Sequence, residues 1–138
     1  MASTEKQLAK QLANVPVFSG LKPKNRALMA KLGKHVTWAE GKVGVKEGSN
    51  ASGFFLVVDG DLSVSQQGTE INSMTTGDFF GEIALLSGGK RTATVTATRR
   101  TQLFAIGRAA LSPAIESNPD FAMDLLKAVA LRQANDIV

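Results

Sequence analysis

The stretch that decides the fold is residues 77–97, with the sequence GDFFGEIALLSGGKRTATVTA. Two glycines frame a pair of phenylalanines, and a short apolar run that favours a helix follows them. A glycine pair then turns the chain before an alternating Thr/Ala/Val segment, which is typical of a strand. We therefore expect a strand end, a tight turn, a short helix, a second turn and a strand. A helix that starts directly after Gly81 presents free backbone N–H groups at the positive end of its dipole, which favours an anion.

Two charged residues narrow down the ligand. Arg91, at the start of the second strand, has a planar and permanently charged guanidinium that suits a phosphate. Glu82, in the first turn of the helix, repels a phosphate but accepts hydrogen bonds from hydroxyl groups. A sugar phosphate meets both requirements, with its phosphate on Arg91 and its ribose hydroxyl on Glu82.

The sequences GEIALL at 81–86 and RTATV at 91–95 resemble the phosphate-binding cassette of cyclic-nucleotide-binding domains. The separation of nine positions between Glu82 and Arg91 is that of the family. The resemblance extends from about Val17 to the C-terminal helix, because three upstream glycines stand where the family turns between strands: Gly41, Gly48 and Gly60. A motif in its expected strand–helix–strand setting is a specific signal.

The resemblance implies a set of residues that bind the cyclic nucleotide: Gly81, Glu82, Ile83, Ala84, Arg91, Thr92 and Ala93. It assigns the amides of Ala84 and Thr92 to the phosphate and Gly81 to the ribose. In this family a hydroxyl at Thr92 can bond the 2-amino group of guanine, and threonine also occurs in domains that take adenine. Both cAMP and cGMP therefore stay open as ligands.

Two further residues are candidates for contacts with the base. Val64 is an apolar neighbour of the base by register, although core packing explains it as readily. Arg132, late in the last helix, can stack its guanidinium on a purine, although a solvated side chain is the ordinary state of such a residue. Departures from the family pattern affect the outer turns: Gly44 interrupts a strand usually filled by larger residues, and Ser49 replaces a common aspartate.

Composition excludes several other classes of site. The 138 residues are 43% hydrophobic and 20% charged, which is ordinary for one globular domain. The absence of cysteine and the single histidine exclude disulfides, thiolate metal sites and multi-histidine sites, so we expect neither metal nor cofactor. The chain has no apolar leader and no membrane-length run, and we expect a cytoplasmic protein without membrane contact. The basic residues behind the net charge of +4 are spread out, which argues against a nucleic-acid partner.

Periodicity divides this single expected domain of residues 1–138 into three parts. Residues 1–33 predict two helices, of which the second runs from Pro23 to a stop at Gly33. Residues 34–107 predict a β-roll that contains the cassette at 77–97, and the expected strands lie at 35–38, 43–45, 54–58, 62–65, 70–74, 92–98 and 102–106. Residues 108–138 predict C-terminal helices.

The C-terminal part contains a short helical segment that Pro113 perturbs, and then a longer helix. Asn118, Pro119 and Asp120 give a strong start signal for the longer helix, whose expected apolar side carries Phe121, Leu125, Leu126, Val129 and Leu131. The expected fold is mainly β with α: an eight-stranded β-roll or jelly roll, flanked by N-terminal helices and a C-terminal lid helix.

The function that we expect is allosteric regulation by a bound cyclic nucleotide, without catalysis, because no nucleophile–base pair accompanies Arg91. The ligand is expected to favour a closed position of the C-terminal helix, hinged near residues 113–119, and the terminal helices are candidate contacts for an effector domain or partner. Two alternatives remain. One is the sensor part of a catabolite-activator-type transcription regulator without its DNA-binding domain, and the other is a ligand-free β-roll scaffold for protein contacts.

Overall fold

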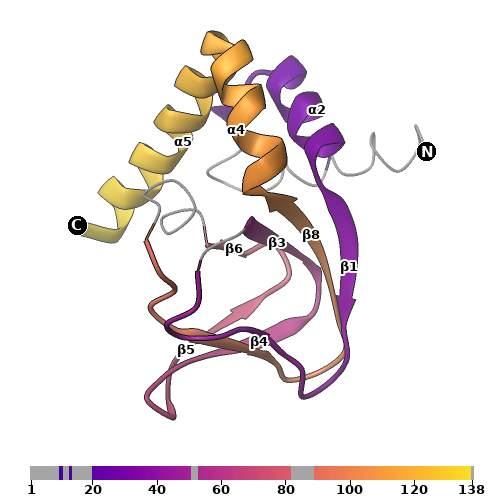
Figure 1. Cartoon of the computed structure of the whole chain (residues 1–138), viewed down its shortest axis with the longest axis vertical. Helices are drawn as coiled ribbons and strands as arrows, with labels where there is room; N and C mark the ends of the chain where they lie inside the picture. The colour runs from indigo at the N-terminus through magenta and orange to yellow at the C-terminus, as the bar shows by residue number, and fades with distance from the viewer. Residues whose placement is uncertain (1–9, 11–12, 14–19, 51–52, 82–88, 138) are drawn as a thin grey trace. The chain divides into compact units, whose positions relative to one another are not determined.

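A computed structural model describes residues 10, 13, 20–50, 53–81 and 89–137 (Figure 1). The chain divides into two compact units. Residues 34–107 contain the strands, and residues 1–33 together with 108–138 contain the helices. We describe the strand unit first and the helical unit second.

Eight strands in the described residues form two antiparallel sheets of four strands each, which is the expected β-roll (Figure 1). The first sheet has the order β1-β8-β3-β6, with bounds Lys34–Trp38, Thr101–Gly107, Gly53–Asp59 and Phe79–Phe80. The second sheet has the order β2-β7-β4-β5, with bounds Val43–Val45, Thr94–Ala97, Asp61–Gln66 and Thr69–Thr75. Strands β3 and β8 are buried over most of their length, as the two inner strands of the first sheet.

The strand unit is built on a core that combines aromatic and aliphatic side chains from both sheets: Trp38, Val45, Val57, Leu62, Phe80, Val95, Ala97 and Leu103. Phe55 is half-buried and stacks on Phe80, with 5.1 Å between the ring centroids. The Trp38 ring lies 5.3 Å from that of Phe55 and 6.3 Å from that of Phe80. Trp38, Phe55 and Phe80 thus pack together inside the roll.

Two corrections concern where elements begin and end. The strand expected from Thr92 begins at Thr94, so Arg91 precedes it by three residues. The short helical segment that Pro113 is expected to perturb is one helix, α4, from Arg108 to Ser117. Proline removes one helical hydrogen bond, and the burial of Leu111 and of Ala114 on either side of it offsets that loss.

The helical unit contains α2 (Pro23–Leu32), α4 and α5 (Pro119–Ile137) in its described part. Helix α2 begins at Pro23 and ends before Gly33, and α5 begins at Pro119, as the capping signals predict. The Asn118 side-chain amide donates to the Ala114 carbonyl at 2.9 Å, which ties the end of α4 to the start of α5.

Helix α5 buries only part of the side that the sequence marks as apolar. Phe121 and Leu125 are buried, whereas Leu126 is 60% exposed. Leu126 directly follows Leu125, and consecutive residues of a helix point about 100° apart, so both cannot face one packing partner.

A polar cluster joins the beginning of α2 to the first turns of α5. The Lys22 ammonium donates to Asp120 at 2.7 Å, and Lys24 lies 3.1 Å from the same carboxylate. The buried Asn25 amide donates to Asp124 at 2.7 Å. Hydrogen bonds from Lys22 and Lys24 lower the pKa of Asp120 to about 2.

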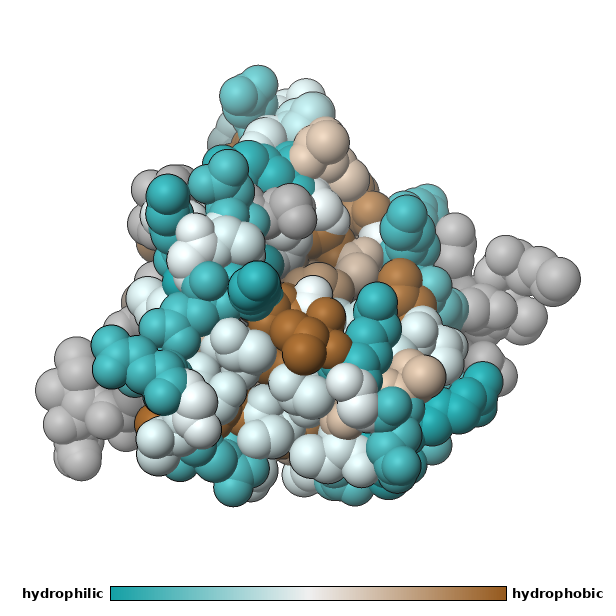
Figure 2. Space-filling model, turned by 60° about the horizontal axis from the view of Figure 1, so that its bottom comes forward, coloured by the Kyte–Doolittle hydropathy of each residue, from teal (hydrophilic) through white to brown (hydrophobic). Residues whose placement is uncertain are grey.

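The outside of the molecule carries mostly hydrophilic and near-neutral side chains on the face that Figure 2 presents, with a smaller hydrophobic area near its centre. Within the described residues, no helix is both long enough and apolar enough to cross a membrane.

The departure at Gly44 yields a first prediction. A Cβ at Gly44 would collide with the indole ring of Trp38, so that ring already fills the space of the missing side chain. Gly44→Ala should therefore destabilise the protein by about 1–3 kcal/mol through overpacking. Urea unfolding measures this, and Gly20→Ala is the matched control, because nothing lies within 4 Å of a Cβ there. Equal stabilities of the two variants would contradict the packing role of Gly44.

The cluster at the start of α5 predicts a pH dependence. The pKa of Asp120 falls from 3.8 to about 2 in the folded protein, so this carboxylate stabilises the fold above about pH 4. That contribution is lost as the pH falls through about 2. Carboxyl-carbon NMR should give an Asp120 midpoint near 2, moving up toward 3.8 when Lys22 and Lys24 are both replaced by methionine. A midpoint near 3.8 in the unmodified protein would show that the ion pairs do not form in solution.

Candidate functional site

Arg91 is the centre of the candidate site. Although it is an arginine, only 8% of its surface is exposed. Its guanidinium donates through Nη1 to the Gly81 carbonyl at 3.2 Å and through Nη2 to the Gly53 carbonyl. Both acceptors are main-chain carbonyls, so these two bonds orient the guanidinium. An oriented and buried cation suits the binding of a planar or tetrahedral oxyanion.

Gly81 permits this arrangement because it lacks a side chain. Its φ of +92° is one that other residues rarely adopt, and a Cβ would run into Nη1 of Arg91. The same Cβ would lie 3.1 Å from the Gly53 carbonyl oxygen. The backbone at Gly81 can therefore approach the guanidinium closely.

The backbone of Arg91 is fixed by the turn between β2 and β3. The Arg91 N–H donates to the Ser49 carbonyl at 2.8 Å, and the Gly48 N–H donates to the Arg91 carbonyl at 2.9 Å. One residue earlier, Lys90 forms an antiparallel bridge with Asn50. Gly48 has a φ of +84°, so the turn depends on a glycine at that position. This turn therefore sets the position of Arg91 through main-chain contacts alone.

The residues that follow Arg91 are held by a side chain from β4 and by a main-chain N–H of the β2–β3 turn. The Gln66 amide donates to the Thr92 carbonyl at 2.9 Å. The hydroxyl of Thr94 accepts from the Glu47 N–H at 3.0 Å. Thr92 itself is exposed and Ala93 is half-buried, so this part of the expected cassette lies near the surface.

The structure brings together Gly81 and Arg91, the first and fifth of the seven expected ligand-binding residues. Glu82, Ile83 and Ala84 lie outside the described residues. The ribose and amide contacts expected of this stretch therefore stay predictions.

The two candidates for base contact lie in different units. Val64, on β4, is half-buried and packs against the core of the strand unit. Arg132 belongs to α5 in the helical unit, and its side chain is outside the described part of the chain. The contact of either residue with a base remains a prediction.

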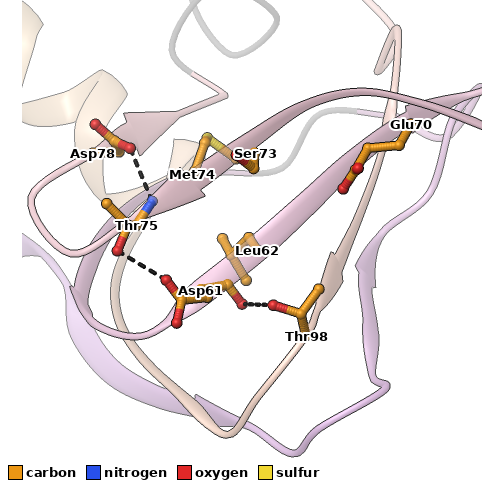
Figure 3. Close-up of a pocket in the computed structure, with 8 residues that line it drawn as sticks. All are labelled: Asp61, Leu62, Glu70, Ser73, Met74, Thr75, Asp78 and Thr98. Carbon is orange, nitrogen blue, oxygen red and sulfur yellow. Dashed lines mark hydrogen bonds between the residues drawn. The ribbon is translucent and has the colours of Figure 1, made fainter.

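A surface pocket of about 220 Å³ lies along the β4–β5 hairpin and includes Asp78 and Thr98 in its lining (Figure 3). Its lining includes the carboxylates of Asp61, Glu70 and Asp78. Asp61 accepts from the Thr75 hydroxyl at 2.9 Å, and Asp78 accepts from the Thr75 N–H at 2.9 Å (Figure 3). Hydrogen bonds from Arg99 and Thr75 lower the pKa of Asp61, so it is ionised at neutral pH. Three carboxylates make this pocket unsuitable for a phosphate.

Metal binding has no basis in the described residues, where no three histidine, aspartate or glutamate side chains gather in a way that could hold an ion.

Four residues of the site escaped the sequence reasoning: Glu47, Ser49, Gly53 and Gln66. Gly53 is 38 residues from Arg91, and Gln66 is 26 residues from Thr92. Ser49 and Gly53 act through carbonyl oxygens, which every residue carries, so residue type gives no signal. The contact of Gln66 with Thr92 could have been predicted only from the pairing of strands, because antiparallel β4 and β7 bring these two residues close together.

Comparison with known proteins identifies this arrangement. Residues 35–118 match the family model for the cyclic nucleotide-binding domain. A cAMP-dependent protein kinase regulatory subunit of Emericella nidulans is 34% identical over 99 residues, which cover 70% of this chain and 24% of the relative. This chain therefore spans about a quarter of the length of that relative.

Solved structures agree with the family match. A cAMP-bound PfPKA-R is 28% identical, with a TM-score of 0.76 over 86% of this chain and 42% of that chain. The N-terminal domain of a transcriptional regulator from Streptomyces coelicolor A3(2) is 29% identical, with a TM-score of 0.80 over 91% of this chain and 95% of that chain.

The contact between Gly81 and Arg91 predicts different effects for two glycine substitutions. Gly77 and Gly81 have similar φ values of +94° and +92°, so alanine strains the backbone at either position by roughly 1–3 kcal/mol. Nothing lies within 4 Å of a Cβ at Gly77, whereas one at Gly81 meets the Arg91 guanidinium. Gly81→Ala should therefore destabilise more in urea unfolding and shift the Arg91 Nε–H NMR signal, which Gly77→Ala should leave in place. An unmoved Arg91 signal in the Gly81 variant would refute the close approach.

Proposed function

The chain belongs to the cyclic nucleotide-binding domain family, and on this premise we propose that it binds cAMP, cGMP or both as a regulatory domain. The observation that carries the proposal is the buried Arg91, whose guanidinium is oriented by the carbonyls of Gly53 and Gly81. Such a group can give a cyclic phosphate two parallel charge-assisted hydrogen bonds at little cost of reorganisation. Glu82 accepts from the ribose hydroxyl, and the amides that follow Gly81 add to the phosphate contacts.

The free energies of the expected hydrogen bonds support binding of a cyclic nucleotide at about micromolar concentrations. A charge-assisted hydrogen bond contributes roughly 1.5–3 kcal/mol, whereas an exposed salt bridge contributes about 0–1 kcal/mol. Two bonds from Arg91 with backbone amides add up to about micromolar affinity. The burial of Arg91 places it in the stronger of these two classes.

Ligand binding acts on the position of the C-terminal helix in this proposal. A ligand shifts an equilibrium between open and closed forms only by its extra affinity for one of them. Helix α5 carries Arg132, the candidate lid residue for the base. A single residue separates the end of α4 from the start of α5. Closure of α5 over the base links occupancy to the surface that an effector contacts.

Two kinds of effector follow from the relatives. The regulatory subunit of Emericella nidulans favours a protein kinase as the regulated partner. The regulator domain of Streptomyces coelicolor favours a transcription regulator, and it is similar over nearly its whole length. The same cassette serves either role, so its residues do not choose between a protein kinase and a transcription regulator.

The test is calorimetric titration with cAMP, cGMP and the linear nucleotide 5′-AMP. Both cyclic nucleotides should bind more tightly than the linear one, whose phosphate carries an additional charge and a different shape. Arg91→Ala removes both of the bonds that Arg91 gives the phosphate, so it should weaken cyclic-nucleotide binding by at least about a hundredfold, the range of two charge-assisted bonds.

The matched control is Arg99→Ala, since Arg99 is exposed and pairs with Asp59 and Asp61 outside the cassette. It should bind cyclic nucleotides like the unmodified protein. Arg91→Ala also leaves the Gly53 and Gly81 carbonyls without this donor, so it should lower stability by roughly 1–3 kcal/mol while the fold persists. Unchanged affinity in a folded Arg91→Ala variant would refute the assignment.

A further inference from the structure

The three residues from Arg91 to Ala93 precede β7, so the ladder between β4 and β7 does not hold them. That ladder pairs Ser65 with Thr94 at its end. The turn at Ser49 fixes the backbone of Arg91 from one side. Contacts made after Arg91 must hold it from the other side, because a guanidinium can bind an oxyanion in bidentate geometry only if it is well placed.

Gln66 supplies the first of these contacts. It is the last residue of β4, and its Nε2 donates to the Thr92 carbonyl at 2.9 Å. The bond joins residues 26 positions apart, so it does not stabilise the β4–β5 hairpin locally. It fixes the peptide that directly follows Arg91.

Glu47 supplies the second contact and acts in two directions. Its N–H donates to the Thr94 hydroxyl at 3.0 Å, and its carboxylate accepts from the Gln67 N–H at 3.0 Å. Gln67 has a φ of +50°, and among the described residues it is the one non-glycine residue with a positive φ. The Gln67–Gly68 turn therefore has the backbone of a two-residue hairpin turn that usually prefers asparagine or glycine. The carboxylate of Glu47 holds this turn against the strand that contains Thr94.

We propose that Gln66 and Glu47 are positioning residues of the anion site. They hold the Thr92 carbonyl and the Thr94 hydroxyl against the β4–β5 turn and thereby keep Arg91 in the orientation that receives the phosphate. The inference deepens the proposed function and rests on it, because it concerns the same site. It adds that the β4–β5 turn, which carries no expected ligand contact, sets the affinity of the cassette.

The test compares variants that remove one contact each. Gln66→Met keeps the length of the side chain and loses the donor, and Glu47→Ala loses the acceptor. Gln66→Met loses a neutral hydrogen bond and should weaken cAMP binding about threefold to tenfold. Glu47→Ala loses a bond to a charged acceptor and should weaken cAMP binding at least as much. Glu47→Gln keeps a neutral acceptor oxygen and should therefore bind cAMP more tightly than Glu47→Ala. Gln102→Met is the matched control, because Gln102 is an exposed glutamine on β8 of the other sheet.

Two readouts separate positioning from simple stabilisation. Affinities are measured well below the melting temperature, where every variant is fully folded, so lost stability alone leaves them unchanged. Backbone amide NMR of the ligand-free variants should show changes at residues 91–94 in Gln66→Met and none in Gln102→Met.

The possible outcomes are distinct. Unmodified protein that binds cAMP, with Gln66→Met and Glu47→Ala binding equally well, would overturn the positioning role and leave the proposed function intact. Unmodified protein that binds no cyclic nucleotide would overturn the proposed function. The amide signals of residues 91–94 then decide the positioning role, which fails if Gln66→Met leaves them unchanged.

Discussion

The structure of the strand unit depends on one buried cation. The guanidinium of Arg91 is removed from water, and two backbone carbonyls accept its hydrogen bonds. A buried charge is tolerated only when it is well hydrogen-bonded, so the segments that supply these carbonyls must hold their positions. Gly81 provides one of them through a backbone conformation that requires glycine, and Gly53 provides the other from the start of β3. The local fold thus follows from accommodating Arg91.

The frame around this cation comes from segments that are distant in sequence. The β2–β3 turn holds the main chain of Arg91, and the β4–β5 turn holds the residues after it through Gln66 and Glu47. Carboxylates line the surface pocket along the β4–β5 hairpin, among them those of Asp61 and Asp78. This pocket therefore disfavours an anion.

The sequence predicted the parts of this arrangement that depend on residue type. Positive φ values at Gly41 and Gly48 confirm the turns read from them, while Gly60 is needed because Thr101 occupies the place of a side chain. The helix starts at Pro23 and Pro119 follow from local capping chemistry and were also predicted correctly.

The parts that escaped prediction depend on tertiary contacts. Strand β7 begins at Thr94 and not at Thr92 because the main chain of Arg91 is hydrogen-bonded to the β2–β3 turn. Helix α4 continues through Pro113 because the burial of its side chains outweighs the missing hydrogen bond. Hydrogen bonds that backbone carbonyls accept, such as those of Ser49 and Gly53, cannot be predicted from the residue type, because every residue has a carbonyl.

The central claim is that the Arg91 guanidinium contacts the phosphate of a cyclic nucleotide, and side-chain NMR of ¹⁵N-labelled arginine tests it most directly. On titration with cAMP, the Arg91 Nε–H signal should shift strongly and become protected from exchange with water, while that of Arg99 stays in place. An Arg91 signal that remains unchanged when the protein is saturated with cAMP would contradict the account.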